Sequence, residues 1–253
     1  MLNYIKSIIL AFFVILGLNT FSQTEPVIDT SSNVLLLKEM SFGVIFHSQG
    51  WGIKFNKGYN KTAFTKRVLE FEMVEIQSPK QIRTINPYFT NSKSYIYGKL
   101  NTVFVFRGSY GMHKLLNRKP YWGGVELRFF YMGGASLGIT KPIYLYILNA
   151  SPIFYEYTIT EEKYDPENHF IDNIFGRAPF TRGFNELSVY PGLNAKVGLD
   201  FDYGVYRTKV KSLEIGAIFE FFPRAVPIMA FNDPEYFFLT FYLNFNFGKR
   251  YNN

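Results

Sequence analysis

The chain has 253 residues and contains no cysteine, only three histidines and only two tryptophans. The lack of cysteine excludes a disulfide scaffold, a thiolate metal site and a lipid anchor attached through cysteine. After the first twenty residues, no apolar run approaches the roughly 20 residues that a membrane-spanning helix needs. A protein with several membrane helices is therefore excluded, whereas a membrane β-barrel is not.

Aromatic residues are abundant, with 28 Phe and 19 Tyr, and a hydrophobic fraction of 47% excludes a disordered chain. The 27 Lys and Arg residues outnumber the 20 Asp and Glu residues, a moderate excess that suits anionic lipid surfaces. The sequence has no interleaved basic and aromatic motif for nucleic acid, so no nucleic-acid partner is expected.

The amino terminus has the pattern of a secretory signal. Lys6 supplies positive charge, an apolar run extends over 8–18, and Thr20 and Ser22 are small residues at the usual positions before a cleavage site. The predicted divisions are a signal peptide at 1–22, a periplasmic lead-in at 23–39, and a barrel at 40–249 with a long loop at 160–191.

The rest of the chain alternates between apolar and polar residues with a period of two, which is typical of β-strands that have two different faces. In the last strand, one face is apolar and the other carries polar residues such as Thr240 and Asn244. Ionisable residues occupy the less apolar face of the strong upstream strands as well. The apolar face of the last strand comprises Phe237, Leu239, Phe241, Leu243, Phe245 and Phe247.

Two structures produce this alternation. In a soluble barrel or sandwich the apolar face points inward, whereas in an outer-membrane barrel it meets lipid and the charged face lines the interior. The secretion signal, the long apolar face of the last strand and the abundance of Tyr and Phe for interfacial girdles favour the second. We therefore predict an all-β, transmembrane antiparallel β-barrel in the outer membrane of a Gram-negative bacterium.

The number of strands follows from parity, because bacterial single-chain barrels have even numbers of strands. Nine strands are clear from the sequence, and segment 153–159 is predicted to be a tenth, with eight or twelve strands as alternatives. The segments 77–94, 160–191 and 223–234 then share the extracellular end, and 203–206 forms a periplasmic turn. A barrel this narrow is filled largely by its own side chains, so an open pore is not expected. The nine clear strands lie near 40–48, 51–57, 66–76, 95–107, 122–133, 142–149, 192–204, 208–222 and 235–248.

Several motifs resemble a family of uncharacterised outer-membrane β-barrel proteins from Bacteroidetes-type bacteria. The resemblance implies an envelope location and a barrel fold, but no reaction, ligand or catalytic residue. The motifs are Ser41-Phe42-Gly43-Val44, Gly50-Trp51-Gly52, Ile85-Asn86-Pro87-Tyr88, the run from Lys93 to Asn101, Gly124 to Arg128, Gly138 to Pro142, and Pro191-Gly192-Leu193.

The strand phases predict a set of charged residues facing the lumen. Because an unpaired buried charge is costly, we expect these residues to form ion pairs across strands, either filling and rigidifying the barrel or lining a charged conduit. The predicted set is Glu70, Glu72, Lys99, Arg107, Glu126, Arg128, Lys196, Asp200, Asp202, Glu214 and Glu220.

The sequence gives no pattern for a catalytic, cofactor or metal site. His47 and Ser48 are neighbours on a strand and point to opposite faces, so they do not form a hydrolase pair without a bulge. His113 lies in a basic stretch that suits a phosphate-facing surface. His169 follows Asp165 in the long loop 160–191, and a single loop with one histidine is weak support for a protease. An acidic loop could also hold calcium, but only weakly.

Three functions remain as hypotheses. The first is a non-enzymatic outer-membrane protein with a structural or accessory role, in contact with membrane lipids and an envelope protein partner. The second is a narrow channel or small-ligand transporter. The third is a barrel enzyme acting on lipid or peptide.

Overall fold

The computed structural model describes residues 36–89, 91–120, 124–150, 157–206 and 208–252. The predicted signal peptide and nearly all of the lead-in lie outside the described residues. The chain divides into two units, Met1–Val34 and Leu35–Asn253, and every described element belongs to the second unit. Within the described residues, no helix is long and apolar enough to cross a membrane.

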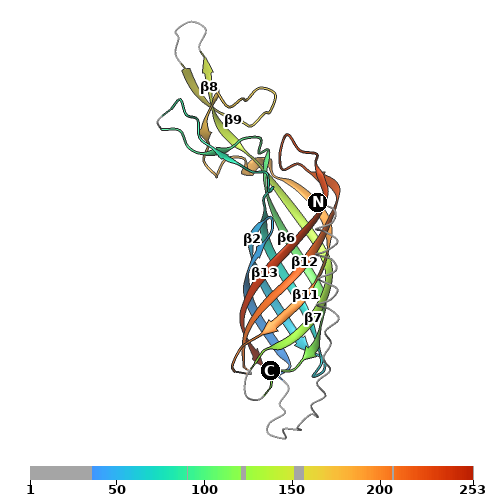
Figure 1. Ribbon diagram of the computed structural model, residues 1–253. Helices are drawn as coiled ribbons and strands as arrows, with labels where there is room; N and C mark the ends of the chain where they lie inside the picture. The colour runs from blue at the N-terminus through green and yellow to red at the C-terminus, as the bar shows by residue number, and fades with distance from the viewer. Residues whose placement is uncertain (1–35, 90, 121–123, 151–156, 207, 253) are drawn as a thin grey trace, which may run out of the picture. The chain divides into compact units, whose positions relative to one another are not determined.

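The described elements are strands, apart from one short 3-10 helix (Figure 1). Their bounds are β1 (Lys38–His47), β2 (Gly50–Asn60), β3 (Thr65–Ile76), β4 (Arg83–Thr84), β5 (Tyr95–Ile96), β6 (Asn101–Asn117), β7 (Glu126–Pro142), β8 (Tyr144–Ala150), β9 (Tyr157–Lys163), β10 (Ile174–Arg177), η1 (Phe184–Glu186), β11 (Ser188–Asp202), β12 (Lys209–Val226) and β13 (Glu235–Tyr251).

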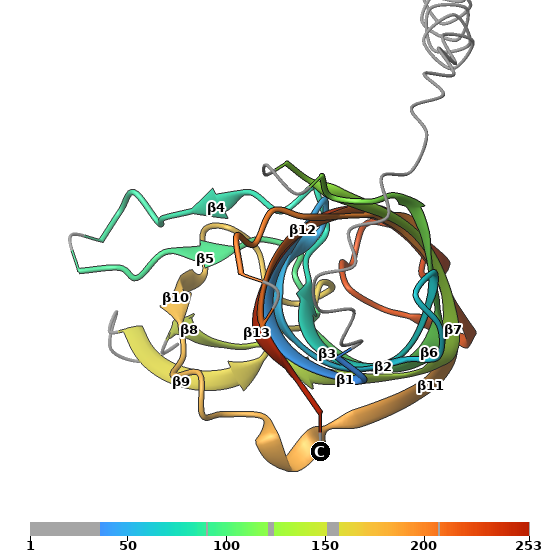
Figure 2. The same ribbon diagram turned by 90° about the horizontal axis from the view of Figure 1, so that it is seen from below.

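A closed antiparallel barrel is formed by eight of these strands, in the order β1-β13-β12-β11-β7-β6-β3-β2. Figure 2 looks along this barrel and shows the ring. The ring closes where β1 pairs with β13 along its whole length, with Phe42 opposite Phe247. Closure leaves no strand edge unpaired. The prediction of ten strands is therefore wrong, and the alternative of eight is the observed number.

The miscount has a local cause at Pro142. The predicted sixth strand, 142–149, corresponds to β8, which leaves the barrel and pairs instead with β9 and β10. Proline has no N–H to donate, so Pro142 favours an end to the ladder that β7 forms. Of the predicted tenth strand, 153–156 lie outside the described residues and 157–159 belong to β9. Two of the ten predicted strands are therefore not barrel strands, and the even number is reached by removing 142–149 from the nine clear strands rather than by adding a tenth.

The long connections share one end of the barrel, as predicted, whereas their extracellular placement stays a prediction. The long connections 77–100, 143–187 and 227–234 lie at one end of the barrel, which we call the mouth. The connections 61–64 and 203–208 lie at the other end, where Tyr251 of β13 pairs with Lys38 of β1.

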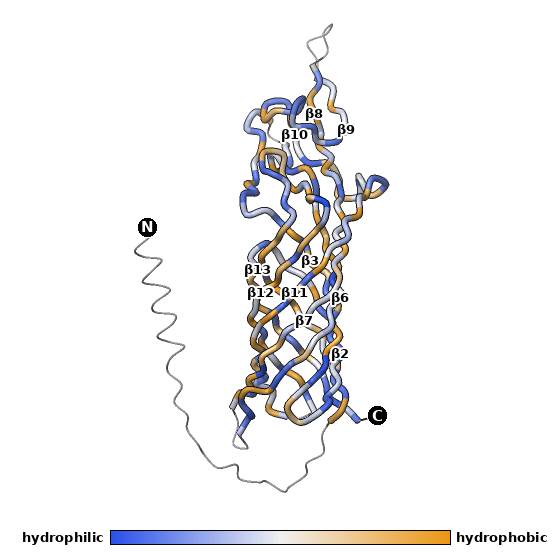
Figure 3. The backbone as a smooth tube through the Cα atoms, turned by 90° about the vertical axis from the view of Figure 1, so that its right-hand side faces the viewer, coloured by the Kyte–Doolittle hydropathy of each residue, from blue (hydrophilic) through white to orange (hydrophobic). Residues whose placement is uncertain are grey.

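The predicted inside and outside faces are confirmed. Phe219 and Phe241 are 53% and 64% exposed on the outer surface, whereas Ser212 and Asn244 on the same two strands are 2% and 0% exposed. Figure 3 shows this alternation of hydropathy along the barrel strands. The barrel is therefore apolar outside and carries buried polar side chains inside, which is typical of a membrane barrel and not of a water-soluble one.

Large aromatic side chains share the lumen with glycines. A Cβ atom on Gly198 would lie 2.7 Å from Cζ of Phe130, and one on Gly216 would lie 2.9 Å from Cε1 of Tyr242. Each glycine therefore makes room for an inward-pointing ring. Towards the mouth, the buried interior is apolar and includes Val74, Ile76, Val103, Val105, Phe222 and Phe238.

The described residues of the connections 77–100 and 143–187 fold together at the mouth, and we call these residues the mouth module. Its sheets are β10-β8-β9 and β4-β5. The connection 77–100 packs directly on β10, because a Cβ atom on Gly176 would lie 2.7 Å from the carbonyl oxygen of Lys93. Asn86, fully buried, donates to the carbonyl of Ile174 over 2.8 Å. The small core of the module consists of Tyr95, Leu145, Ile147, Tyr164 and Ile174.

Backbone hydrogen bonds join the mouth module to the barrel connections. The N–H of Leu100 donates to Ile228 over 3.0 Å, and the N–H of Ala230 donates to Gly98 over 2.7 Å. The N–H of Ile143 donates to Leu100 over 3.0 Å. The residues of the module next to β6 and β7 are thus held by backbone hydrogen bonds, as the strands of the barrel are.

The first prediction concerns the outer face. Phe241→Arg, near the middle of β13, should destabilise the protein by about 2–4 kcal/mol, because it places a charge against lipid. The measurement is reversible denaturant unfolding in lipid vesicles, with Phe241→Leu as the matched apolar control. If the arginine variant proved as stable as the leucine variant, this face would not meet lipid.

Candidate functional site

Charged residues from five strands meet at the middle of the lumen. We call the seven that touch one another the central ion network: Lys54, Glu70, Glu72, Arg107, Lys196, Glu214 and Glu220. Six of them belong to the set predicted from the sequence, and Lys54 does not. The network joins β2, β3, β6, β11 and β12, which are not all neighbours in the sheet.

The two lysines of the network each bridge two carboxylates. Nζ of Lys54 lies 2.6 Å from Glu70 and also contacts Glu214. Nζ of Lys196 lies 2.7 Å from Glu70 and also contacts Glu72. Glu70 is therefore shared between both lysines, which links β2 to β11 across the lumen.

The arginine of the network extends the chain of contacts from Glu72 to Glu220. Arg107 binds Glu220 with two guanidinium nitrogens, at 2.9 Å and 2.7 Å, and reaches Glu72 at 3.3 Å. The hydroxyl of Ser136 donates to Glu220 over 3.0 Å. Bidentate arginine–carboxylate contacts of this kind combine strength with fixed geometry.

The network leaves no space for water around its members. The side chains of Lys54 and Glu220 are 0% exposed, and that of Arg107 is 1% exposed. Because even an internal void would expose part of their surface, the side chains fill the lumen at this level. This geometry fits the predicted filling and rigidifying role better than a charged conduit.

A second group of charges lies nearer the end of the barrel opposite the mouth, where the first residues of β1 pair with the last residues of β13. Glu39 accepts from Lys66 at 2.7 Å and from Arg250 at 2.8 Å, and Arg250 also contacts Asp202. His113 lies 3.7 Å from Asp200 and is 2% exposed. The expectation that His113 belongs to a phosphate-facing surface is therefore wrong, because strand β6 extends through it and turns its ring inward.

Two of the remaining predicted residues, Glu126 and Arg128, also share the lumen-facing phase, because they stand opposite Asp202 and Asp200 in the strand register. They are partly buried at the start of β7 and pair with each other at 2.5 Å. Lys99 is not on a barrel strand at all. It is buried between β5 and β6 in the mouth module, and its Nζ donates to Gln81 over 3.3 Å.

The sequence signal for Lys54 was present but weak. Strand 51–57 was predicted, and Lys54 stands between the outward-facing Ile53 and Phe55, so its inward position follows from the phase. Glu39 and Arg250 were missed because they lie just beyond the predicted ends of the first and last strands.

The histidines form no catalytic arrangement with the predicted partners. His47 is buried and Ser48 is exposed, as expected for neighbours on a strand. Nδ1 of His169 accepts from the N–H of Asp165 over 3.0 Å, and Nε2 lies 3.2 Å from Glu162, so this ring ties a loop of the mouth module together. The described part of the chain contains no cluster of three or more His, Asp or Glu residues that could hold a metal.

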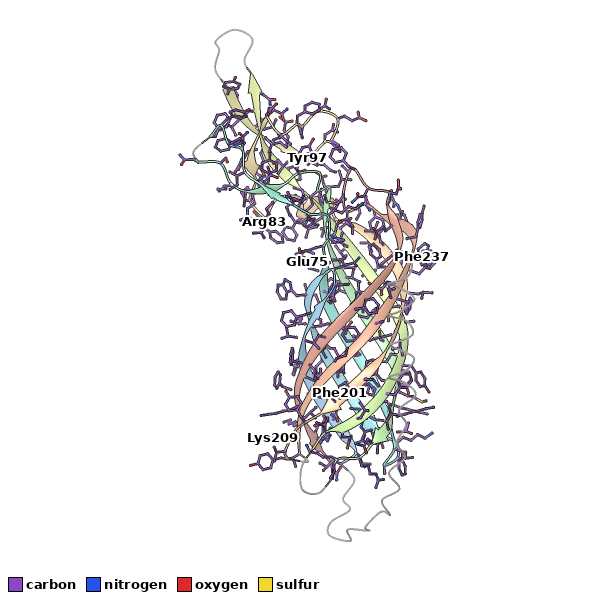
Figure 4. All side chains as sticks on the ribbon, viewed as in Figure 1. Glu75, Arg83, Tyr97, Phe201, Lys209 and Phe237 are labelled. Atoms are coloured by element: carbon purple, nitrogen blue, oxygen red, sulfur yellow. The ribbon has the colours of Figure 1, made fainter. Side chains whose placement is uncertain are left out.

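A cavity of about 690 Å³ lies at the mouth, where barrel and module residues face each other. We call it the mouth cavity. Figure 4 labels two of its residues, Glu75 at the end of β3 and Arg83 in the module. Its aromatic lining comes from Trp51, Tyr95, Tyr144 and Phe180, and its cationic lining from Arg83, Lys93, Lys99, Lys141 and Arg177, with Glu75 as the one carboxylate among the described lining residues.

The cations of the mouth cavity are not neutralised by carboxylates. None of the five forms a salt bridge with any residue that the structure describes. Lys141 donates to the backbone carbonyls of Phe180 and Arg182, both at 3.0 Å. Burial lowers the pKa of Lys99, and the nearby charges of Arg83 and Lys141 lower it further against the opposing effect of Glu75.

Comparison with known proteins finds similarity in solved structures only. No family model matches the sequence, and no curated protein matches it. Neisserial surface protein A has 6% identity and a TM-score of 0.41, over 85% of this chain and 96% of that one. Ail, the attachment invasion locus protein of Yersinia pestis, solved with the heparin analogue sucrose octasulfate, has 10% identity and a TM-score of 0.39, over 85% and 97%. Similarity this low carries no functional argument, so the barrel assignment stands on the strand pairing of this chain.

The second prediction concerns the central ion network. Lys196→Met should destabilise the barrel by about 3–5 kcal/mol, because it leaves buried carboxylates without one of their partners. Lys211→Met, an exposed position on β12, is the matched control and should change stability by about 0.5 kcal/mol or less. The measurement is denaturant unfolding in detergent micelles. Equal stability of the two variants would mean that the network does not hold the barrel together.

Proposed function

We propose that the protein is a non-enzymatic integral protein of the bacterial outer membrane, a closed barrel that anchors the mouth module at the cell surface. The observation that carries this proposal is the combination of an apolar outer face with a lumen filled by the central ion network. The role is structural or accessory, and the module is the part available to other molecules.

The outer surface supports contact with membrane lipid. Its exposed side chains include Phe42, Val44, Ile53, Phe71 and Phe247 on neighbouring strands, which in water would form a large apolar patch. In a bilayer the same surface is favourable. Outer-membrane lipids are thus the first proposed partner. An envelope protein partner and membership of the uncharacterised Bacteroidetes-type barrel family belong to the same proposal.

A channel is less well supported than an anchor. The side chains of the central ion network are packed without solvent contact, and apolar residues fill the interior between the network and the mouth. A continuous water path would require both layers to open.

The absence of a recognisable nucleophile and base among the described histidine sites favours a non-enzymatic role over a barrel hydrolase.

The third prediction tests the closed lumen. Purified protein reconstituted in planar bilayers should give no conductance steps above the bare bilayer, because the ion network fills the barrel. Insertion is verified on the same sample by the resistance of the barrel to protease. Reproducible steps that change with Arg107→Ala would favour the channel.

The fourth prediction tests the orientation and uses the absence of native cysteine. Phe170→Cys in the mouth module should react with a membrane-impermeant maleimide on intact cells, whereas Val205→Cys at the opposite end should not. Both positions are exposed, at 56% and 84%, so both should react equally in detergent. Labelling of Val205→Cys alone on intact cells would invert the proposed orientation.

A further inference from the structure

We propose that the mouth cavity binds a saccharide that carries two or more phosphate groups. The proposal goes beyond the anchor function and assigns a ligand class to a part of the chain that the barrel does not need for closure. Only the placement of this site at the cell surface rests on the proposed function; binding itself does not.

The first argument is charge. Five cations and one carboxylate line the cavity, a net charge of about +4 within about 690 Å³. In the barrel, by contrast, the central ion network pairs each of its three cations with carboxylates. Cations gathered without carboxylate partners repel one another, so a ligand of opposite charge would relieve that repulsion.

The second argument is the kind of cation. Arg83 and Arg177 present planar guanidinium groups from β4 and β10, and their forked donors match the oxygens of a phosphate. Lys93 and Lys99 flank β5 in the connection 77–100 and supply further donors. Two phosphates carry about as much negative charge as the cavity has in excess.

The third argument is the rest of the lining. The residues that line the cavity also include the aromatic Trp51, Tyr144 and Phe180. Aromatic rings combined with a few polar groups that set orientation are typical of small-ligand sites, and the cavity volume falls within the range of such sites. The cavity thus suits a sugar ring with phosphate substituents better than an isolated inorganic ion.

The position of Trp51 provides a way to observe binding. It is one of two tryptophans in the sequence, so Trp122→Phe leaves it as the single tryptophan, which can be excited selectively over tyrosine. Trp51 is among the residues that line the cavity and is 56% exposed, so an occupant should change its emission.

The fifth prediction is the binding experiment. Fructose 1,6-bisphosphate should bind the full-length protein in a zwitterionic detergent with one site, as measured by calorimetry and by Trp51 fluorescence. Fructose 6-phosphate should bind at least about tenfold more weakly, because it lacks one set of charge-assisted hydrogen bonds. Fructose should not bind.

A charge-matched pair of triple variants locates the site. Arg83→Gln/Lys93→Gln/Arg177→Gln should weaken binding at least about tenfold. These three residues are exposed and form no salt bridge among the described residues, so the fold should survive. The control Lys61→Gln/Lys114→Gln/Lys209→Gln removes three exposed cations outside the cavity and should bind like the wild type.

The outcomes separate the alternatives. Absence of bisphosphate binding at millimolar concentration, an equal loss in both triple variants, or equally tight binding of citrate would each overturn the proposal.

A second arm compares phosphatidylcholine nanodiscs with and without lipid A, a glucosamine disaccharide that carries two phosphates. Saturation of the site by lipid A would identify the membrane glycolipid as the source, whereas undiminished bisphosphate binding would identify a free sugar phosphate. Because the first arm uses detergent, it can succeed even if the orientation test fails.

Discussion

The rest of the structure depends on the pairing of buried charges inside a closed barrel. An eight-stranded barrel encloses an interior about as wide as the side chains that fill it, so an inward-pointing charge has no route to water. Each such charge must therefore meet a partner from another strand, or its desolvation would destabilise the fold. Glu70 shows how this is achieved, because it contacts both Lys54 and Lys196 and so connects strands that do not pair in the sheet.

The sequence was sufficient for the faces of the strands and insufficient for their number. Alternation with a period of two is a local property, and it placed Phe241 outside and Asn244 inside as observed. Which sheet a strand joins is not a local property, because it depends on segments that are distant in the sequence. Segment 142–149 has the same alternation in β8, with Leu145 and Ile147 buried, but those side chains enter the core of the mouth module. Periodicity cannot distinguish one buried face from another, and only Pro142 marked the boundary.

The candidate sites show the same division. Six members of the central ion network follow from strand phase alone, since charges on one face of a narrow barrel have nowhere else to go. Their partners do not follow, because which carboxylate meets which lysine depends on register and stagger around the ring. The mouth cavity was beyond reach for a stronger reason: Lys141 lies at the end of barrel strand β7, whereas Lys99 and Arg177 come from two different connections, and only the folding of the mouth module brings the three together.

The contrast between these two groups of charges indicates where the protein acts. In the lumen, opposite charges are matched and packed, which is what stability requires. At the mouth, five cations line a cavity without a salt bridge in the described structure, and burial disfavours the charged form of Lys99. Local arrangements that oppose stability are expected at functional sites, because the binding partner supplies what the fold omits. In the function proposed above, the barrel is therefore a rigid support, and the binding chemistry lies at the mouth that the support carries.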